Sequence, residues 1–298
     1  MGVTMYADDL LLIAPTRGAM QKMLDVCESF ATRYNILFST DPIPSKSKSK
    51  CIFMVGSKKN MVKPLPLMLG GKELPWVDTA THLGHELHES GNMEHDAKVK
   101  RAEFIDKSVE VREIFQFASA VEVLQALKIY CSSFYGSMLW DLAGNGASQV
   151  FNAWNMAIKL TWECPRDTRN YLVQQVLSCG MTSASTDILS RYAKFFKGLR
   201  TSTSKEVATL ANLMGRDVQA TTGKNIRLIE ERSGLSVWST GQEKLKEAIA
   251  LNEKVAVDEA DMWRIPLLGK LLEQKQELGY LGANLEETSN LINSLCIN

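Results

Sequence analysis

The stretch GVTMYADDLLLIA, residues 2–14, places two adjacent carboxylates between two short apolar runs. Both runs are rich in β-forming or large aliphatic residues and are too short for a buried helix. We therefore expect two strands that meet at a tight turn, with Asp8 and Asp9 at its tip. Carboxylates held there reach solvent and suit Mg²⁺, which prefers oxygen ligands and takes one or two protein carboxylates plus substrate phosphates.

The string around the acidic pair is more specific than the pair itself, which is usually a turn or cap feature because Asp favours turns. Tyr6-Ala7-Asp8-Asp9, followed by LLLIAPT, resembles the active-site hairpin of reverse transcriptases, most closely those of non-LTR retrotransposons (long interspersed elements). The resemblance implies RNA-directed DNA polymerase activity, with Mg²⁺ as cofactor and an RNA template and DNA primer as partners. It implies that Asp8 is the principal metal ligand and Asp9 its neighbour. Tyr6 and Ala7 would set the turn and pack beside the primer.

The charge of the chain is balanced overall and uneven along its length. The 298 residues, a length that favours two structural units, carry 34 basic and 34 acidic side chains, whereas a dedicated nucleic-acid binder is usually basic. Residues 45–72 hold seven Lys and no acid, but residues 243–298 hold six bases and ten acids, a net charge of 6 − 10 = −4. The acidic end would repel phosphate, so it favours a protein partner.

The cysteines and histidines do not indicate a metal site. No two of the six Cys have CxxC spacing, which favours a reduced, intracellular setting in the cytoplasm or nucleus. The longest apolar run, residues 10–14, is far too short to span a membrane, so no membrane partner is expected. His82, His85 and His88 are spaced three residues apart; on a strand this spacing alternates faces, which disfavours zinc.

A lysine-rich segment, SKSKSK at residues 45–50, comes before an expected strand over residues 51–55. Taken alone, such a run is typical of a solvated loop. Non-LTR enzymes carry a Lys-Ser/Thr-Lys element at this distance, and the resemblance implies a lysine near the phosphates of the incoming nucleotide. It could stabilise charge or protonate the leaving group there. We choose Lys48, with Lys46 and Lys50 as alternatives.

Further strands are expected over residues 35–39, 65–69, 72–77 and 81–87, and a helix over residues 17–34 with Thr16 as its N-cap. Gly70-Gly71 marks the turn between the second and third of these strands. In the family that the chain resembles, a Leu-Gly strand helps to hold the 3′ end of the primer, and Leu83-Gly84 occupies that place here. A Gly inside a strand marks a bulge or a close approach of another backbone, so a bulge without a ligand is an equal alternative.

From residue 92 onward the pattern is helical. Helices are expected over residues 92–117, 119–134, 148–163, 168–179, 184–199, 204–214, 224–233, 242–256 and 263–280. The fold class is therefore α+β: a partial polymerase palm over residues 1–91, thumb-like helices over 92–143 and a helical C-terminal extension over 144–298. Tyr192, Phe195 and Phe196 have helical spacing, which favours a core role over base stacking. Beyond about residue 215 the sequence indicates no chemistry.

The polymerase reaction uses two metals about 3.5–4 Å apart, and the family holds them with three carboxylates. Two belong to the Tyr-x-Asp-Asp box, and the third lies on a strand well upstream. Five residues precede Tyr6 here, so we expect no polymerase activity from this chain alone. The alternatives are a non-catalytic nucleic-acid-binding protein and a helical interaction protein. An RNA-directed RNA polymerase is less favoured, because those enzymes usually carry Gly where this chain has Ala7.

Overall fold

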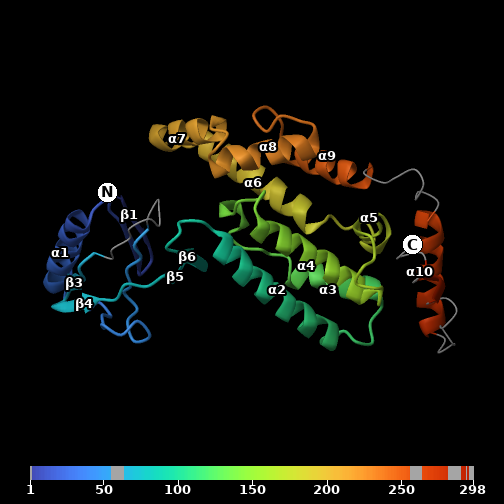
Figure 1. Cartoon of the computed structure of the whole chain (residues 1–298), viewed down its shortest axis with the longest axis horizontal. Coiled ribbons are helices and arrows are strands. Elements are labelled where there is room, and N and C mark those ends of the chain that lie inside the picture. Colours follow the sequence, from blue (N-terminus) through green and yellow to red (C-terminus); the bar gives the residue numbers. More distant parts are fainter. Residues whose placement is uncertain (1, 55–63, 256–263, 281–289, 293, 295–298) are drawn as a thin grey trace. The chain divides into compact units, whose positions relative to one another are not determined.

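The computed structural model describes residues 2–54, 64–255, 264–280, 290–292 and 294. Short antiparallel hairpins occupy the first part of the chain and helices occupy the rest, so the fold is a mixture of α and β structure (Figure 1). The chain divides into two compact units, Met1–Asp96 and Ala97–Asn298, which we call the first and second unit. The finer division at residue 143 that the sequence suggests stays a prediction.

The first unit contains three separate two-stranded antiparallel sheets and one long helix. Its elements are β1 (Gly2–Tyr6), β2 (Asp9–Ile13), α1 (Arg17–Tyr34), β3 (Leu67–Leu69), β4 (Lys72–Leu74), β5 (Thr79–His82) and β6 (His85–His88). Hydrogen bonds pair β1 with β2, β3 with β4, and β5 with β6. Among the described residues the expected single palm-like sheet is thus replaced by three hairpins.

Helix α1 follows the sequence prediction at both ends. The Thr16 hydroxyl accepts a hydrogen bond from the Ala19 N–H at 3.2 Å, and Asn35 ends the helix in the left-handed conformation with φ 55°. The Gln21 side chain exchanges two hydrogen bonds of 2.9 Å with the Met68 backbone in β3. These contacts fix the helix against the β3–β4 hairpin.

The core of the first unit is small. Leu24 of α1 packs with three buried leucines of the β3–β4 hairpin, Leu67, Leu69 and Leu74. Leu12 of β2 packs against the same cluster and is only partly buried. The helix thus joins the first hairpin to the second, as its Leu and Met spacing predicts.

The strand predictions for residues 35–39 and 51–55 are wrong, and those for 65–69 and 72–77 are only partly right, since the first of these two strands begins at Leu67. Residues 35–39 form no strand, and in the segment 51–54 only Cys51 pairs, through a single parallel bridge to Trp76. Val55, the last residue of that expected strand, lies outside the described residues. The strand expected over 72–77 ends at Leu74.

The strand expected over residues 81–87 is instead a hairpin. Leu83 and Gly84 form a two-residue turn between β5 and β6, with φ 49° and 77°. Turns with positive φ at both central residues match the twist of the flanking strands, which is why hairpins favour them. Gly84 is therefore a turn residue rather than a bulge inside a strand.

The second unit is helical, and its helices lie close to the predicted ranges. They are α2 (Glu94–Ile114), which begins in the first unit, then α3 (Ala120–Tyr130), η1 (Ser137–Leu139), α4 (Asn145–Thr161), α5 (Asn170–Leu172), η2 (Val173–Leu177), α6 (Ala184–Arg200), α7 (Lys205–Arg216), α8 (Thr221–Ser233), α9 (Gln242–Val255) and α10 (Arg264–Tyr280). The expected helix over 168–179 is a single α-helical turn followed by one wider turn, η2.

Aromatic side chains fill the core of the second unit. Trp154 of α4 is 2% exposed and contacts Phe104, whose ring centroid lies 5.8 Å away. Tyr192 and Phe196 of α6 are also buried, which confirms their predicted core role, whereas Phe195 is only partly buried. Helix α6 contacts α4, α7, α8 and α9, so it is the central helix of this unit (Figure 1). No helix in the described part of the chain is both long and apolar enough to cross a membrane.

Candidate metal-binding hairpin

The acidic pair lies at the tip of the β1–β2 hairpin, as the sequence predicts. Tyr6 pairs with Asp9 across the hairpin, which leaves Ala7 and Asp8 as a two-residue turn. Asp8 is therefore in the turn itself, and Asp9 is the first residue of β2. All four residues of this tip are exposed, and Tyr6 retains 71% of its accessible surface. The carboxylates are held by a short sheet and face solvent.

The turn holds Ala7 in a conformation that alanine rarely adopts. Its φ is 53°, in the left-handed region that favours Gly, Asn and Asp. A side chain with a Cβ is strained there by roughly 1 kcal/mol. The pairing of β1 with β2 along all five residues of each strand keeps Ala7 in this conformation.

The two faces of the hairpin differ. Directly paired residues of an antiparallel sheet point to the same face, so Tyr6 and Asp9 share one face while Leu12 belongs to the other. Leu12 packs against the core of the first unit, but Met5, on the same face and nearer the tip, is 75% exposed. The core therefore supports the part of the hairpin away from the tip, and Tyr6 and Asp9 project from the face opposite Leu12.

The fit of this tip to a divalent cation rests on its donor set. Asp8 and Asp9 offer carboxylate oxygens, the ligands that Mg²⁺ prefers, and two protein carboxylates are a common complement when substrate phosphates complete the shell. No group of three or more His, Cys, Asp or Glu side chains is gathered for a metal within the described ranges. The residues at the tip thus fit a Mg²⁺ ion that shares its ligands with a substrate.

The lysine-rich segment is an ordered loop rather than a freely solvated run. Ser47 is buried; its hydroxyl donates to the Ser49 carbonyl oxygen at 2.6 Å and accepts from the Asp41 N–H at 3.2 Å. The alternating Lys46, Lys48 and Lys50 side chains are exposed. In the part of the chain that the structure describes, no hydrogen bond or ion pair joins Lys48 to either tip carboxylate.

The Leu83-Gly84 turn belongs to a different sheet from the acidic pair. Both of its residues are exposed. The hairpin also changes the histidine geometry: His82 lies directly opposite His85 and shares its face, whereas His88 stacks on His95 with centroids 5.6 Å apart. The argument that all three histidines alternate along one strand was therefore wrong.

The thiols do not point to nucleophilic chemistry. Burial raises the pKa of Cys51 to about 11 and also raises the pKa of Cys27, Cys131 and Cys179. A reactive cysteine needs a lowered pKa, because the thiolate is the nucleophile. These four cysteines are therefore held in their neutral form at neutral pH.

Sequence reasoning missed a cavity of about 290 Å³ in the second unit. Arg216, Ile226, Arg227 and Trp238 are among the residues that line it. A tryptophan and two arginines within 23 positions are the only sequence signal for it, and such mixtures are common on helical surfaces.

Comparisons of the chain with protein-family models, curated proteins and solved structures found no match.

Proposed function

We propose that the chain is the palm and thumb portion of an RNA-directed DNA polymerase of the non-LTR retrotransposon type. One observation carries this proposal: the string Tyr6-Ala7-Asp8-Asp9 lies on a two-residue turn with both carboxylates exposed. Neighbouring exposed carboxylates at such a turn can both be reached by a metal ion and by a polynucleotide end.

In this proposal Asp8 and Asp9 bind Mg²⁺, which would supply positive charge next to the reacting phosphate. Tyr6 shares a face with Asp9, so its exposed ring can pack against the primer end that the carboxylates serve. Lys48 would bind phosphates of the incoming nucleotide, and the exposed Leu83-Gly84 turn would contact the primer. These two roles rest on the resemblance alone.

A non-catalytic nucleic-acid-binding protein is the second candidate function. The ordered loop that exposes Lys46, Lys48 and Lys50 supports it, because three neighbouring cations can bind phosphate without any metal. Binding by such a loop needs neither Asp8 nor Asp9. The two functions therefore differ in whether the acidic pair contributes to binding.

Iron-directed cleavage tests the metal site directly. Fe²⁺ replaces Mg²⁺ at carboxylate sites and, with ascorbate and peroxide, produces radicals that cut the backbone beside the bound ion. We expect cleavage within residues 2–13, competition by Mg²⁺, and loss of cleavage in Asp8→Asn and Asp9→Asn. Asp25→Asn is the matched control, since Asp25 is an exposed carboxylate on α1 rather than on the hairpin. Cleavage that is unchanged in the two tip variants would contradict the proposal.

Binding of a fluorescent RNA–DNA template–primer separates the two functions. A polymerase hairpin predicts that Mg²⁺ strengthens binding and that Asp8→Asn removes this increment. A metal-free lysine loop predicts binding that falls steeply with salt, survives both tip substitutions and weakens in Lys48→Gln. The resemblance implies that the two-metal reaction needs a third carboxylate besides Asp8 and Asp9, so in a primer-extension assay with Mg²⁺ or Mn²⁺ we expect no incorporation by these residues alone.

A further inference from the structure

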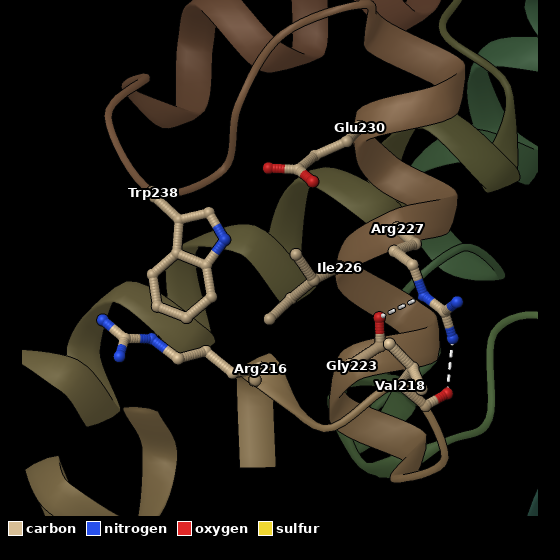
Figure 2. A pocket seen from close by; sticks show the side chains of 8 residues that line it. Arg216, Val218, Gly223, Ile226, Arg227, Glu230 and Trp238 are labelled. Carbon is tan, nitrogen blue, oxygen red and sulfur yellow. Dashed lines mark hydrogen bonds between the residues drawn. The ribbon is translucent and has the colours of Figure 1, made fainter. Parts of the chain in front are cut away.

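The cavity in the second unit lies between α7, α8 and the loop that follows α8. Figure 2 shows Ile226 between Trp238 and Arg227, with Glu230 toward one end and Val218 toward the other. Its volume of about 290 Å³ is near the lower limit of roughly 300 Å³ for small-molecule sites. The space therefore suits a compact small molecule rather than an extended one.

Trp238 is a fixed platform at the edge of this cavity. Phe196 packs edge-on against the indole, with centroids 5.4 Å apart and an interplanar angle of 89°. The Arg200 guanidinium lies 4.5 Å from the indole centroid and donates to the Trp238 carbonyl oxygen at 3.2 Å. Because its ring and its backbone are both held, Trp238 can offer a flat surface without a large loss of side-chain entropy on binding.

The charged groups that line the cavity favour an anion. Arg216 and Arg227 against Glu230 give a formal charge of 2 − 1 = +1. The Glu230 carboxylate accepts hydrogen bonds from the Ser236 hydroxyl and the Val237 N–H, both at 3.0 Å, so it is committed to holding this loop.

Both arginines can reach a ligand. Arg216 is exposed, with its guanidinium 5.9 Å from the Trp238 ring centroid. Arg227 donates to the Gly223 and Val218 carbonyl oxygens, which anchor its head and use two of its five N–H groups (Figure 2). A positioned guanidinium is well suited to bind the oxygens of a phosphate.

We propose that this cavity binds one nucleotide unit, with the base against Trp238 and the phosphate near Arg216 and Arg227. Aromatic rings stack with any base, and arginine supplies both phosphate and cation–π contacts. The bound nucleotide is either free or one residue of a single strand, since both present a base and a phosphate. This proposal goes beyond the function proposed for the hairpin, because all of its residues lie in the second unit and none depends on Asp8 or Asp9.

Calorimetry and fluorescence anisotropy with the full chain test the ligand class. The probes are adenosine monophosphate, adenosine, inorganic phosphate, phenyl phosphate and labelled ten-nucleotide single strands of adenine. We expect adenosine monophosphate to bind more tightly than adenosine or phosphate, since it uses both halves of the cavity. If the ten-nucleotide single strand binds far more tightly than adenosine monophosphate, the cavity is a nucleic-acid site. If the two bind with equal affinity, it is a site for free nucleotides.

Three variants and two matched controls locate the binding. Trp238→Leu should weaken binding by about 5- to 150-fold, the usual contribution of one stacked base. Arg216→Gln should lower the slope of log affinity against log salt for the single strand by about 0.7. Val218→Glu, at an exposed position in the lining, should weaken binding by at least about tenfold through charge repulsion. Gln219→Glu adds a negative charge, as Val218→Glu does, and Arg232→Gln removes a positive charge, as Arg216→Gln does. Both control positions lie outside the lining, so the affinity should be unchanged.

The outcomes distinguish this proposal from the hairpin's function. If Trp238→Leu does not fold, the affinities of Val218→Glu and Gln219→Glu are compared instead. Both positions are exposed, so both variants should fold. Equal affinities for adenosine monophosphate and inorganic phosphate would overturn the proposal. Phenyl phosphate that binds as tightly as adenosine monophosphate would also overturn it, and would point instead to a phosphorylated peptide. Retained affinity in Asp8→Asn, together with loss in Val218→Glu, would support the cavity even if the hairpin binds no metal.

Discussion

The two units of the chain differ in how completely they bury their own apolar side chains. In the first unit, four leucines form the buried cluster, while Val3 is 60% and Met5 75% exposed on the hairpin that carries the acidic pair. In the second unit, Trp154 is 2% exposed and Leu127 is 1% exposed. Two-stranded hairpins are marginal by themselves, so the first unit should open at a lower free energy than the second. The recognisable chemistry thus lies in the part with the least internal support.

The largest effect should come from truncating the core of the second unit. Trp154→Ala removes a buried aromatic ring that contacts Phe104 and the Lys128 ammonium, whose nitrogen lies 5.4 Å from the ring centroid. We expect a loss of about 3–5 kcal/mol in the free energy of unfolding, measured by urea denaturation. Val26→Ala, in the first unit, removes a side chain that is 69% exposed and should change stability by less than about 0.5 kcal/mol. A similar loss from both variants would contradict the contrast between the units.

A smaller loss is expected where α8 approaches the preceding loop. A Cβ on Gly223 would lie 2.0 Å from the Asp217 carbonyl oxygen, so Gly223→Ala must move backbone. We expect a cost of about 3 kcal/mol in the free energy of unfolding, with faster hydrogen exchange in α8. Gly198→Ala is the matched control: nothing lies within 4 Å of its added Cβ, and alanine should stabilise the helix by up to about 1 kcal/mol.

The second unit should also lose stability in acid through Asp187. Burial by itself would raise the pKa of Asp187, but hydrogen bonds from Lys128, Lys246 and Thr182 and the charge of Lys128 hold it below the usual 3.8. The stabilisation of the folded state by ionised Asp187 is therefore complete above pH 3.8. It is lost as the pH falls through the lower pKa that Asp187 has in the folded state.

Asp187→Asn measures this contribution. At pH 7 the variant should be less stable by about 2 kcal/mol, the usual size for hydrogen bonds to a charged group. The difference from the unsubstituted chain should shrink below pH 3.8, as followed by thermal unfolding across a pH series. Asp167→Asn, at an exposed position of the same unit, should not lower the stability at pH 7 or below pH 3.8. A difference that does not shrink at all as the pH falls below 3.8 would show that the carboxylate's charge is not responsible.

The contrast between the units also explains what the sequence could predict. Helix α1 has a capping threonine at its start and regular apolar spacing, and both are local signals, so its ends are predicted to the residue. The acidic hairpin is equally local, because Tyr6 and Asp9 are only three positions apart. Where an element depends on neighbours close in the chain, its residue pattern contains most of the information.

The wrong or missing predictions concern segments whose structure depends on contacts distant in sequence or on unusual backbone conformations. Leu83 has a positive φ and is a poor turn residue, so alternation through Leu83-Gly84 resembles one continuous strand. The apolar run after Cys51 resembles a strand, but in the segment 51–54 only Cys51 forms a β-bridge, opposite Trp76 and through hydrogen bonds to the backbones of Pro75 and Val77. The cavity brings Arg216 to Trp238 across a helix and two loops, and no periodic pattern encodes such a convergence. Residues near the candidate metal site could therefore be predicted, whereas those of the cavity could not.

The smallest expected effect concerns the turn at the acidic tip and sharpens the comparison within the first unit. Ala7→Gly removes the Cβ that is strained at φ 53°, but it also increases the conformational freedom of the unfolded chain. The net gain should be about 0.5 kcal/mol, seen as slower exchange of the β1 and β2 amides. Ala7→Val, with a β-branched side chain at the same φ, should lose more than about 1 kcal/mol and speed that exchange. Exchange in α4 and α6 should change in neither variant, because those helices belong to the second unit. If Ala7→Val left the hairpin amides unchanged, the tip would not hold its turn in solution, and the positions of Asp8 and Asp9 would lose their physical basis.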